Sequence, residues 1–293
     1  ISMVPDGIVP EALMTVAAAA TVFSVMFVVG LRIPFGEFRW VWDHPGLIAR
    51  GLFAVLVAVP AVAIVVARAL DLPRAADIGI VLMAISPGAP VALRRSLGAG
   101  GHRSFAPALQ ILVAMLAVVS MPVSIALLNH VYAGHASIDP LVLARQVFTA
   151  QLLPLGLGML IRSNAPAFAG RIEPALSRVA SAMLIALVVL AVVDIAQVVA
   201  RAGPRVAAAI VIVTVFAVGV GHLLGGPEPA TRTAVAITSA ARNPGLALLV
   251  AALNRAPPEI TATILAYLLV SAATLIPYVA WRRRAAPPPA AGA

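Results

Sequence analysis

Nine long apolar runs follow one another along the sequence, separated by short breaks that are polar or rich in Pro and Gly. A helix needs about 20 apolar residues to cross the roughly 30 Å hydrocarbon core of a bilayer, and these runs are of that order. Segments inside that core must satisfy their own backbone hydrogen bonds, as a helix does. The pattern predicts transmembrane helices at residues 11–31, 46–70, 75–97, 104–130, 138–162, 174–202, 203–225, 229–254 and 258–281.

The composition agrees with an all-α polytopic membrane protein. Hydrophobic residues make up 62% of the chain and charged residues 11%, against about 45–50% and about 25% in a typical soluble domain. All 20 basic residues are Arg, and they lie mainly at the ends of the apolar runs. This placement is typical of membrane topology, so the net charge of +9 does not indicate nucleic-acid binding. The expected surrounding is the lipid bilayer, with no nucleic-acid partner.

The distribution of Arg predicts the orientation. If the N-terminus lies outside, 13 Arg residues fall on the cytoplasmic side and 6 on the outer side, with Arg242 inside a run. Positive charge collects on the cytoplasmic side of membrane proteins. We therefore expect the N-terminus outside and the C-terminus in the cytoplasm, as in a bacterial inner-membrane protein.

Two of the predicted helices contain similar interruptions. The run 75–97 contains Pro87-Gly88-Ala89-Pro90, and the run 229–254 contains Asn243-Pro244-Gly245. Proline removes a helix donor and clashes with the preceding turn, and glycine accepts backbone angles that other residues avoid. Each cluster alone could be a simple kink, since both residues are common in membrane helices. Their matching positions favour two discontinuous helices that form a transport site.

The two interrupted helices also predict an internal repeat. Each is the third member of a run of four helices, and the two runs begin on opposite sides of the membrane, as in an inverted repeat. The predicted division has an N-terminal repeat at 1–131, broken at 86–90, and a C-terminal repeat at 174–281, broken at 242–245. The helix at 138–162 is extra, and we expect residues 282–293, which are basic and then rich in Pro and Ala, to be a disordered tail.

Three short motifs resemble the bile acid:sodium symporter family, a group of secondary carriers of organic anions. They are Val29-Gly30-Leu31 with Phe38-Arg39, Ser86-Pro87-Gly88, and the stretch Arg242-Asn243-Pro244-Gly245-Leu246-Ala247-Leu248. The resemblance covers most of the chain. It implies a panel of the first, fifth and sixth helices and a core of the other six, in which the two broken helices cross.

The sequence departs from the family at the positions that bind sodium. Where sodium-binding members carry a Ser-Asn pair after the first break, this chain has Ala92 and Leu93. Where they carry a Glu and a Gln before the second break, it has Thr238 and Arg242. A hard cation needs several oxygen ligands, and a guanidinium repels it at close range. We expect no cofactor and no metal, and weak or absent sodium binding.

Arg242 is the most informative residue. A charge at the centre of a span costs at least about 2.5–3.5 kcal/mol on insertion scales, so its side chain should face a cavity or a partner. It could replace a sodium ion and brace the crossing, pair with the carboxylate of a substrate, or bond carbonyls freed at the break 86–90. The candidate substrate site comprises Pro87, Gly88, Ala89, Pro90, Thr238, Ser239, Arg242, Asn243, Pro244 and Gly245.

The sequence thus favours a secondary transporter of small organic anions that works by alternating access. A proton-coupled or uncoupled carrier of the same fold is the alternative, with Asp194 as the candidate proton carrier, although its position near the outer end of the run favours a wetted helix end for this residue. Arg94 and Arg95 could attract an anion or extend to the membrane interface. An intramembrane enzyme would need paired carboxylates or a metal cluster, which the runs lack, and a receptor would not need two broken helices.

Overall fold

Every regular element is helical in the part of the chain that the computed structural model describes, which comprises residues 11–33, 42–131, 139–201 and 203–285. Two of the long helices contain a π-helical turn, η2 and η3. The elements are α1 (Glu11–Arg32), α3 (Pro45–Phe53), η2 (Ala54–Ala58), α4 (Val59–Ala69), α5 (Arg74–Ala84), α6 (Pro90–Gly98), α7 (Phe105–Val131), α8 (Pro140–Val147), η3 (Phe148–Leu152), α9 (Leu153–Asn164), α10 (Pro166–Arg201), α11 (Gly203–Leu224), α12 (Pro229–Ala240), α13 (Pro244–Leu253) and α14 (Pro258–Ala285).

Eight helices or helix pairs within the described ranges are long and apolar enough to cross a membrane, and one of them is the interrupted pair α12 and α13. The remaining predicted span, 75–97, is present as α5 and α6, which have 11 and 9 residues. At 1.5 Å per residue, neither crosses a core of roughly 30 Å alone. The predicted division after residue 202 is also found, since α10 ends at Arg201 and α11 begins at Gly203.

Two predicted boundaries need correction. Helix α10 begins at Pro166 and not at 174, and Glu173 in this added part binds Arg32 of α1. Helix α14 continues to Ala285, so the first residues of the predicted disordered tail are helical. Arg282 joins this end of α14 to α12: its Nε donates to Thr233 Oγ1 at 2.7 Å, and its Nη2 donates to the Pro229 carbonyl at 3.0 Å. The rest of that tail, 286–293, lies outside the described residues.

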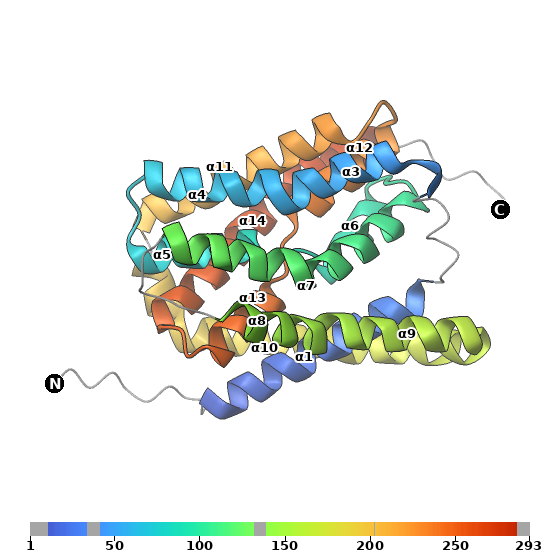
Figure 1. Ribbon diagram of the computed structural model, residues 1–293, viewed down its shortest axis with the longest axis horizontal. Coiled ribbons are helices and arrows are strands. Elements are labelled where there is room, and N and C mark those ends of the chain that lie inside the picture. The colour runs from blue at the N-terminus through green and yellow to red at the C-terminus, as the bar shows by residue number, and fades with distance from the viewer. Residues whose placement is uncertain (1–10, 34–41, 132–138, 202, 286–293) are drawn as a thin grey trace.

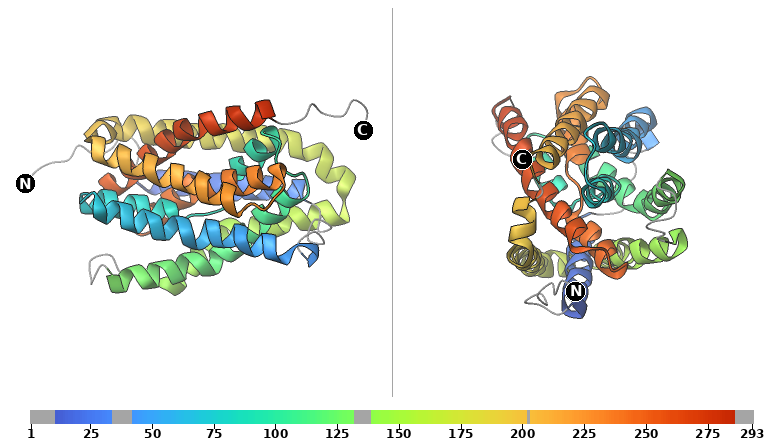
Figure 2. Two further views of the ribbon diagram at one scale, coloured as in Figure 1. Left: turned by 90° about the horizontal axis from the view of Figure 1, so that it is seen from above. Right: turned by 90° about the vertical axis from the view of Figure 1, so that its left-hand side faces the viewer.

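The helices form two packed groups (Figures 1 and 2). Helices α1, α9 and α10 contact one another and lie together at the lower edge of Figure 1. In the second group, α11 packs against α4, α12 and α14, and α5 packs against α4 and α14. The groups meet where α1 contacts α13 and α10 contacts α14. Helix α1 also contacts α6, so the seam between the groups runs past both broken helices.

Small residues allow the closest helix contacts. A Cβ added to Gly30 of α1 would lie 2.9 Å from the backbone nitrogen of Met159, and one added to Gly158 of α9 would lie 2.9 Å from the Gly30 Cα. Similarly, a Cβ on Gly221 of α11 would lie 2.6 Å from the Ala236 Cα of α12. Such contacts drive helix association in lipid, where the hydrophobic effect between helices is lost. Gly30 belongs to the first motif of the sequence.

The outer surface of the bundle is apolar. Large side chains on different helices are highly exposed, such as Val65 at 62%, Val119 at 61% and Ile276 at 64%. A monomeric soluble protein rarely exposes a continuous apolar surface of this kind. The apolar surface and the long apolar helices identify an integral membrane protein.

Gly158→Ala should destabilise the protein, because the new methyl group would force α9 away from α1. Overpacking of this kind costs about 1–3 kcal/mol. Gly156→Ala is the matched control, since no atom lies within 4 Å of a Cβ added there. Thermal unfolding in detergent should show a lower midpoint only for Gly158→Ala. Equal midpoints for the two variants would show that the α1–α9 contact does not limit stability.

Candidate functional site

Both predicted helix interruptions are present. Helix α5 ends at Ala84 and α6 begins at Pro90, while α12 ends at Ala240 and α13 begins at Pro244. Both second halves begin with proline, which is tolerated at the first helical position because that N–H needs no partner. Gly88 lies between the first two halves with φ of 83°, a conformation that favours glycine.

The two interruptions meet. The backbone N–H of Asn243 donates to the carbonyl of Ser86 at 2.9 Å, which joins the second break directly to the first. Gln110 of α7 donates from Nε2 to the carbonyl of Ala89 at 3.2 Å. Backbone groups that leave a helix in lipid need such partners. The crossing is therefore held by hydrogen bonds between segments that are far apart in the sequence.

Asn243 uses both ends of its side chain. Its Oδ1 accepts from the Leu246 N–H at 3.1 Å and caps α13, and its Nδ2 donates to Gln151 Oε1 at 3.3 Å. Gln151 lies in η3 and donates from Nε2 to the Ala114 carbonyl of α7 at 3.0 Å. All of Gln151 is buried. This amide thus ties the second break to two other helices.

Arg242 bonds a carbonyl that the neighbouring π-helix leaves free. In η2 the Val59 N–H donates to Ala54, five residues earlier. The next bond in that register would join residue 60 to Val55, but residue 60 is Pro60 and has no N–H. Arg242 replaces the missing N–H donor, with Nη1 donating to the Val55 carbonyl at 3.0 Å. The carbonyl that Arg242 contacts is therefore not one of those freed at 86–90.

The other edge of the Arg242 guanidinium has no partner. The residue is only 5% exposed, and its Nε and Nη2 are buried without a hydrogen bond in the described part of the chain. Buried donors without a partner are rare and costly, about 1–3 kcal/mol each. These two N–H groups form one side of the planar fork that binds carboxylates in a bidentate way.

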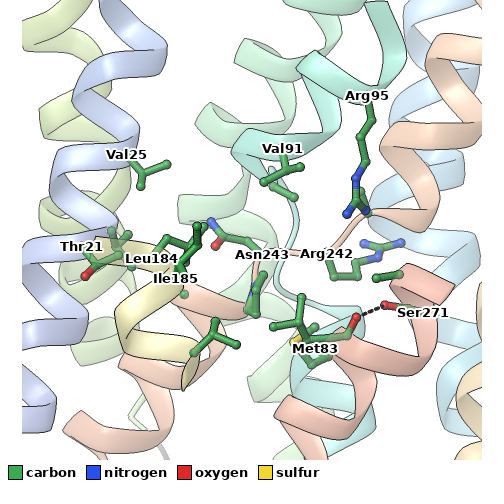
Figure 3. Close-up of a pocket in the computed structure, with 18 of the residues that line it drawn as sticks. Thr21, Val25, Met83, Val91, Arg95, Leu184, Ile185, Arg242, Asn243 and Ser271 are labelled. Carbon is green, nitrogen blue, oxygen red and sulfur yellow. Dashed lines mark hydrogen bonds between the residues drawn. The ribbon is translucent and has the colours of Figure 1, made fainter. Parts of the chain in front are cut away.

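A cavity of about 260 Å³ lies beside the crossing, between the two helix groups (Figure 3). Of the predicted site residues, Ala89, Arg242, Asn243, Pro244 and Gly245 line it. Pro87, Gly88, Thr238 and Ser239 are buried but are not among its lining residues. Pro90 begins α6, and its side chain lies outside the described part. The residues of the second break thus line the cavity, whereas Pro87 and Gly88 of the first break do not.

The opposite walls were not predicted. They come from α1, α10 and α14 and are apolar apart from Thr21 and Ser271: Thr21, Val22, Val25 and Met26, then Leu184, Ile185, Val188 and Val189, then Leu268, Ser271, Ala272 and Leu275. Apolar residues on transmembrane helices look the same whether they face lipid or a cavity, so the sequence carried no signal for them. Only the packing of neighbouring helices decides which of these side chains face the cavity and which face lipid.

The cavity continues towards a basic end of the bundle. A smaller recess between α1, α6 and α10 shares Val25, Val91 and Leu184 with it and reaches Arg32 and Arg94. Arg95 lines the cavity itself, while Arg94 lines the recess. The adjacent arginines thus have different positions. The side chain of Asp194, the candidate proton carrier, lies outside the described part of α10.

Asn243→Ala should lower stability strongly, because it removes the cap of α13 and leaves Gln151 Oε1 buried without its donor. The cap contributes about 0.5–2 kcal/mol, and an unsatisfied buried acceptor costs about 1–3 kcal/mol. Asn254→Ala is the control, since Asn254 makes a similar bond to Gln146 at 3.3 Å where both side chains are partly exposed. The midpoint of thermal unfolding should fall more for Asn243→Ala than for Asn254→Ala. A larger fall for Asn254→Ala would contradict the role of Asn243 in stabilising the crossing.

Comparison with known proteins agrees with this architecture. The model of the sodium bile acid symporter family matches residues 19–202, which include the first break but not the second. The probable sodium/metabolite cotransporter BASS3, chloroplastic, of Oryza sativa subsp. japonica is 25% identical over 158 residues, which cover 54% of this chain and 36% of that protein. The P3 protein of Homo sapiens is 26% identical over 142 residues, which cover 47% of this chain and 29% of that protein.

The chain thus aligns with about a third of the length of these curated relatives. The family match, by contrast, extends over more than half of the chain, from α1 through α10. The protein therefore belongs to the sodium bile acid symporter family.

Proposed function

We propose that the protein is a secondary transporter of small organic anions that works by alternating access. The observation that carries the proposal is the direct contact between two broken helices, Asn243 N–H to Ser86 O at 2.9 Å, beside a cavity of about 260 Å³. Broken helices at membrane depth are tolerated where they line a cavity or are buried in protein. They are the usual construction of transporter sites.

The two helix groups act as the moving parts in this proposal. Helices α1, α8 to α9 and α10 form a panel, and the other six spans form a core, in which α5 and α6 together count as one span. Each of the two inverted four-helix repeats supplies one helix to the panel, α1 or α10, and three spans to the core. The cavity is bounded by panel helices α1 and α10 on one side and by the core crossing on the other. A movement of one group against the other would change which end of the cavity is open.

One end of the seam is closed. A small apolar cluster joins α1, η3 and α10 to α13: Ala18, Val22, Met26, Ala150, Leu187 and Leu249. The bond from Asn254 to Gln146 joins α13 to α8 on the same side. The other end leads through the recess to Arg32 and Arg94. With the N-terminus outside, as the Arg distribution favours, this conformation opens towards the cytoplasm.

The charges at the cavity favour an anionic substrate. Helices α6 and α13 each begin just after one of the two segments that meet at the crossing, and helix N-termini carry partial positive charge. Arg95 and Arg242 are the charged residues among those that line the cavity. The remaining walls are largely apolar, which suits an organic body attached to the anionic group.

Purified protein in liposomes tests this function. Uptake of labelled pyruvate, 3-phenylpropionate and taurocholate should exceed that of protein-free liposomes for at least one anion. These probes cover small, intermediate and large carboxylates or sulfonates. Uptake of none of them, with the protein shown to be folded in the membrane, would contradict an organic-anion carrier.

The same geometry favours a carrier that does not use sodium at the family's usual positions. Ala92 and Leu93 are buried in α6 and supply no side-chain oxygen. Three carbonyls at or beside the crossing already accept bonds from protein donors: Ser86 from Asn243, Ala89 from Gln110, and Val55 of η2 from Arg242. We infer that the Arg242 guanidinium supplies permanently the positive charge that sodium supplies in sodium-binding members.

Thermal unfolding in detergent should therefore be nearly the same in sodium chloride and in N-methylglucamine chloride at equal ionic strength. A ligand stabilises the folded state by RT ln(1 + [L]/Kd), which approaches zero when its concentration is far below Kd. Arg242→Gln should destabilise the protein and restore some sodium response through the new amide oxygen. A clear rise in midpoint with sodium in the unmutated protein would contradict the inference and make Gln110 Oε1, which is buried without a partner in the described part, the first candidate ligand.

Gly245→Leu should abolish transport and have a smaller effect on the folded amount. A Cβ at Gly245 would lie 3.0 Å from Val22 Cγ2, so a longer side chain would fill the seam between α13 and α1. Gly219→Leu on α11 is the control, since no atom lies within 4 Å of a Cβ there. Uptake in liposomes and the yield of folded protein should be measured together. Normal uptake by Gly245→Leu would refute the role of this seam, and loss of folded protein would make it structural.

A further inference from the structure

The cavity brings together two arginines from different parts of the core. Arg242 belongs to the second break, and Arg95 lies on α6, which follows the first break. Figure 3 shows their guanidinium groups at the same end of the cavity, with Arg95 extending from α6 towards Arg242. The sequence alone predicted for Arg95 only a general role in attracting anions or a position at the membrane interface.

Neither guanidinium is fully used by the protein. Arg242 donates a hydrogen bond from Nη1 to the Val55 carbonyl, and its Nε and Nη2 have no hydrogen-bond partner in the described part of the chain. Arg95 is partly buried and makes no hydrogen bond or ion pair within the described part of the chain. No carboxylate is among the residues that line the cavity. Among the described side chains, two cations therefore share one end of a largely apolar cavity that no carboxylate lines.

We propose that Arg95 and the Nε–Nη2 edge of Arg242 form the subsite that holds the acidic group of the substrate. This inference rests on the proposed function and names the residues that recognise the anion. The free edge presents two parallel N–H groups, the geometry that a carboxylate or sulfonate accepts in a bidentate bond. Arg95 closes over the other side of the acidic group.

The subsite also fixes where the apolar part of the ligand lies. With its acidic group at the arginine end, the apolar body lies against the walls of α1 and α10, which Val25, Leu184 and Ile185 form. The Arg242 nitrogens are shielded in this conformation. Long, partly exposed side chains change rotamer in picoseconds to nanoseconds, so Arg95 can move aside to admit the ligand. The ligand class is an anion with one acidic end and one apolar end.

Three probes with the same apolar body and different charge test the subsite: 3-phenylpropionate, 3-phenylpropan-1-ol and 3-phenylpropylamine. Calorimetric titration of the purified full chain should give the tightest binding for the anion. Arg95→Gln should weaken binding of the anion by roughly tenfold or more, since charge-assisted bonds are about twice as strong as neutral ones. It should leave binding of the alcohol unchanged.

Arg94→Gln is the matched control, because Arg94 is the preceding residue and lines the recess instead of the cavity. It should change binding of the anion by less than about twofold, as an exposed charge contributes little. Arg242→Lys keeps the charge but loses the paired N–H groups, so a folded Arg242→Lys variant should also bind the anion more weakly and the alcohol equally well. If Arg242→Lys does not fold, the comparison of Arg95→Gln with Arg94→Gln still decides the test.

The outcomes separate the two proposals. If the unmutated protein binds and transports anions and Arg95→Gln behaves like Arg94→Gln, the subsite is wrong and the proposed function stands. If Arg95→Gln weakens binding of the alcohol as much as binding of the anion, Arg95 shapes the cavity and does not recognise charge, and the subsite proposal is again wrong. If the unmutated protein binds neither 3-phenylpropionate, pyruvate nor taurocholate, both proposals fail.

Discussion

The arrangement depends on one constraint: backbone groups released inside a membrane must find partners within the protein. Two helices stop where the residues of their breaks, such as Ser86 and Asn243, are buried in the protein, so protein groups replace the lost bonds. Asn243 meets Ser86, Gln110 meets Ala89, and Arg242 meets Val55. Each bond joins segments that are distant in the sequence. The partners of the broken helices thus fix the positions of α7 and η2 around the crossing.

Prolines decide where those partners are needed. Pro90 and Pro244 begin the second half of each broken helix, and Pro60 follows the π-helix η2. At Pro60 the missing N–H leaves the Val55 carbonyl without its regular donor, and a guanidinium supplies the bond. Pro154 follows η3 in the same way, next to the buried amide of Gln151. π-Helical turns often accompany functional sites, and here both lie beside the crossing.

The sequence predicted those features that are local. The apolar runs predicted the helices, and the two Pro/Gly clusters predicted the interruptions, because both patterns act within a few residues. Arg242 stood out since a charge in an apolar run needs a partner. Its partner, Val55, could not be predicted, because it depends on how α12 packs against η2. Gln151 was missed for the same reason, although its proximity to Pro154 in an apolar run was an available signal. The boundary of α14 was wrong because the contacts of Arg282 with Thr233 and Pro229 are tertiary.

A guanidinium at the crossing has a consequence for the energetics of transport. A sodium ion is bound on one side of the membrane and released on the other, so its gradient can do work in each cycle. The charge of Arg242 is covalently attached, so the proposed movement leaves it at the crossing in both conformations. In the proposed mechanism it stabilises the crossing and the anion, but it carries no energy from one side to the other. The direction of net transport then follows the gradient of the substrate itself, or of another ion that moves with it. An anion that neutralises Arg242 also lowers the cost of holding that charge in a low-dielectric interior. In the proposed mechanism the loaded carrier is therefore the state in which the buried charge is best satisfied, which favours exchange of one anion for another over return of the empty carrier.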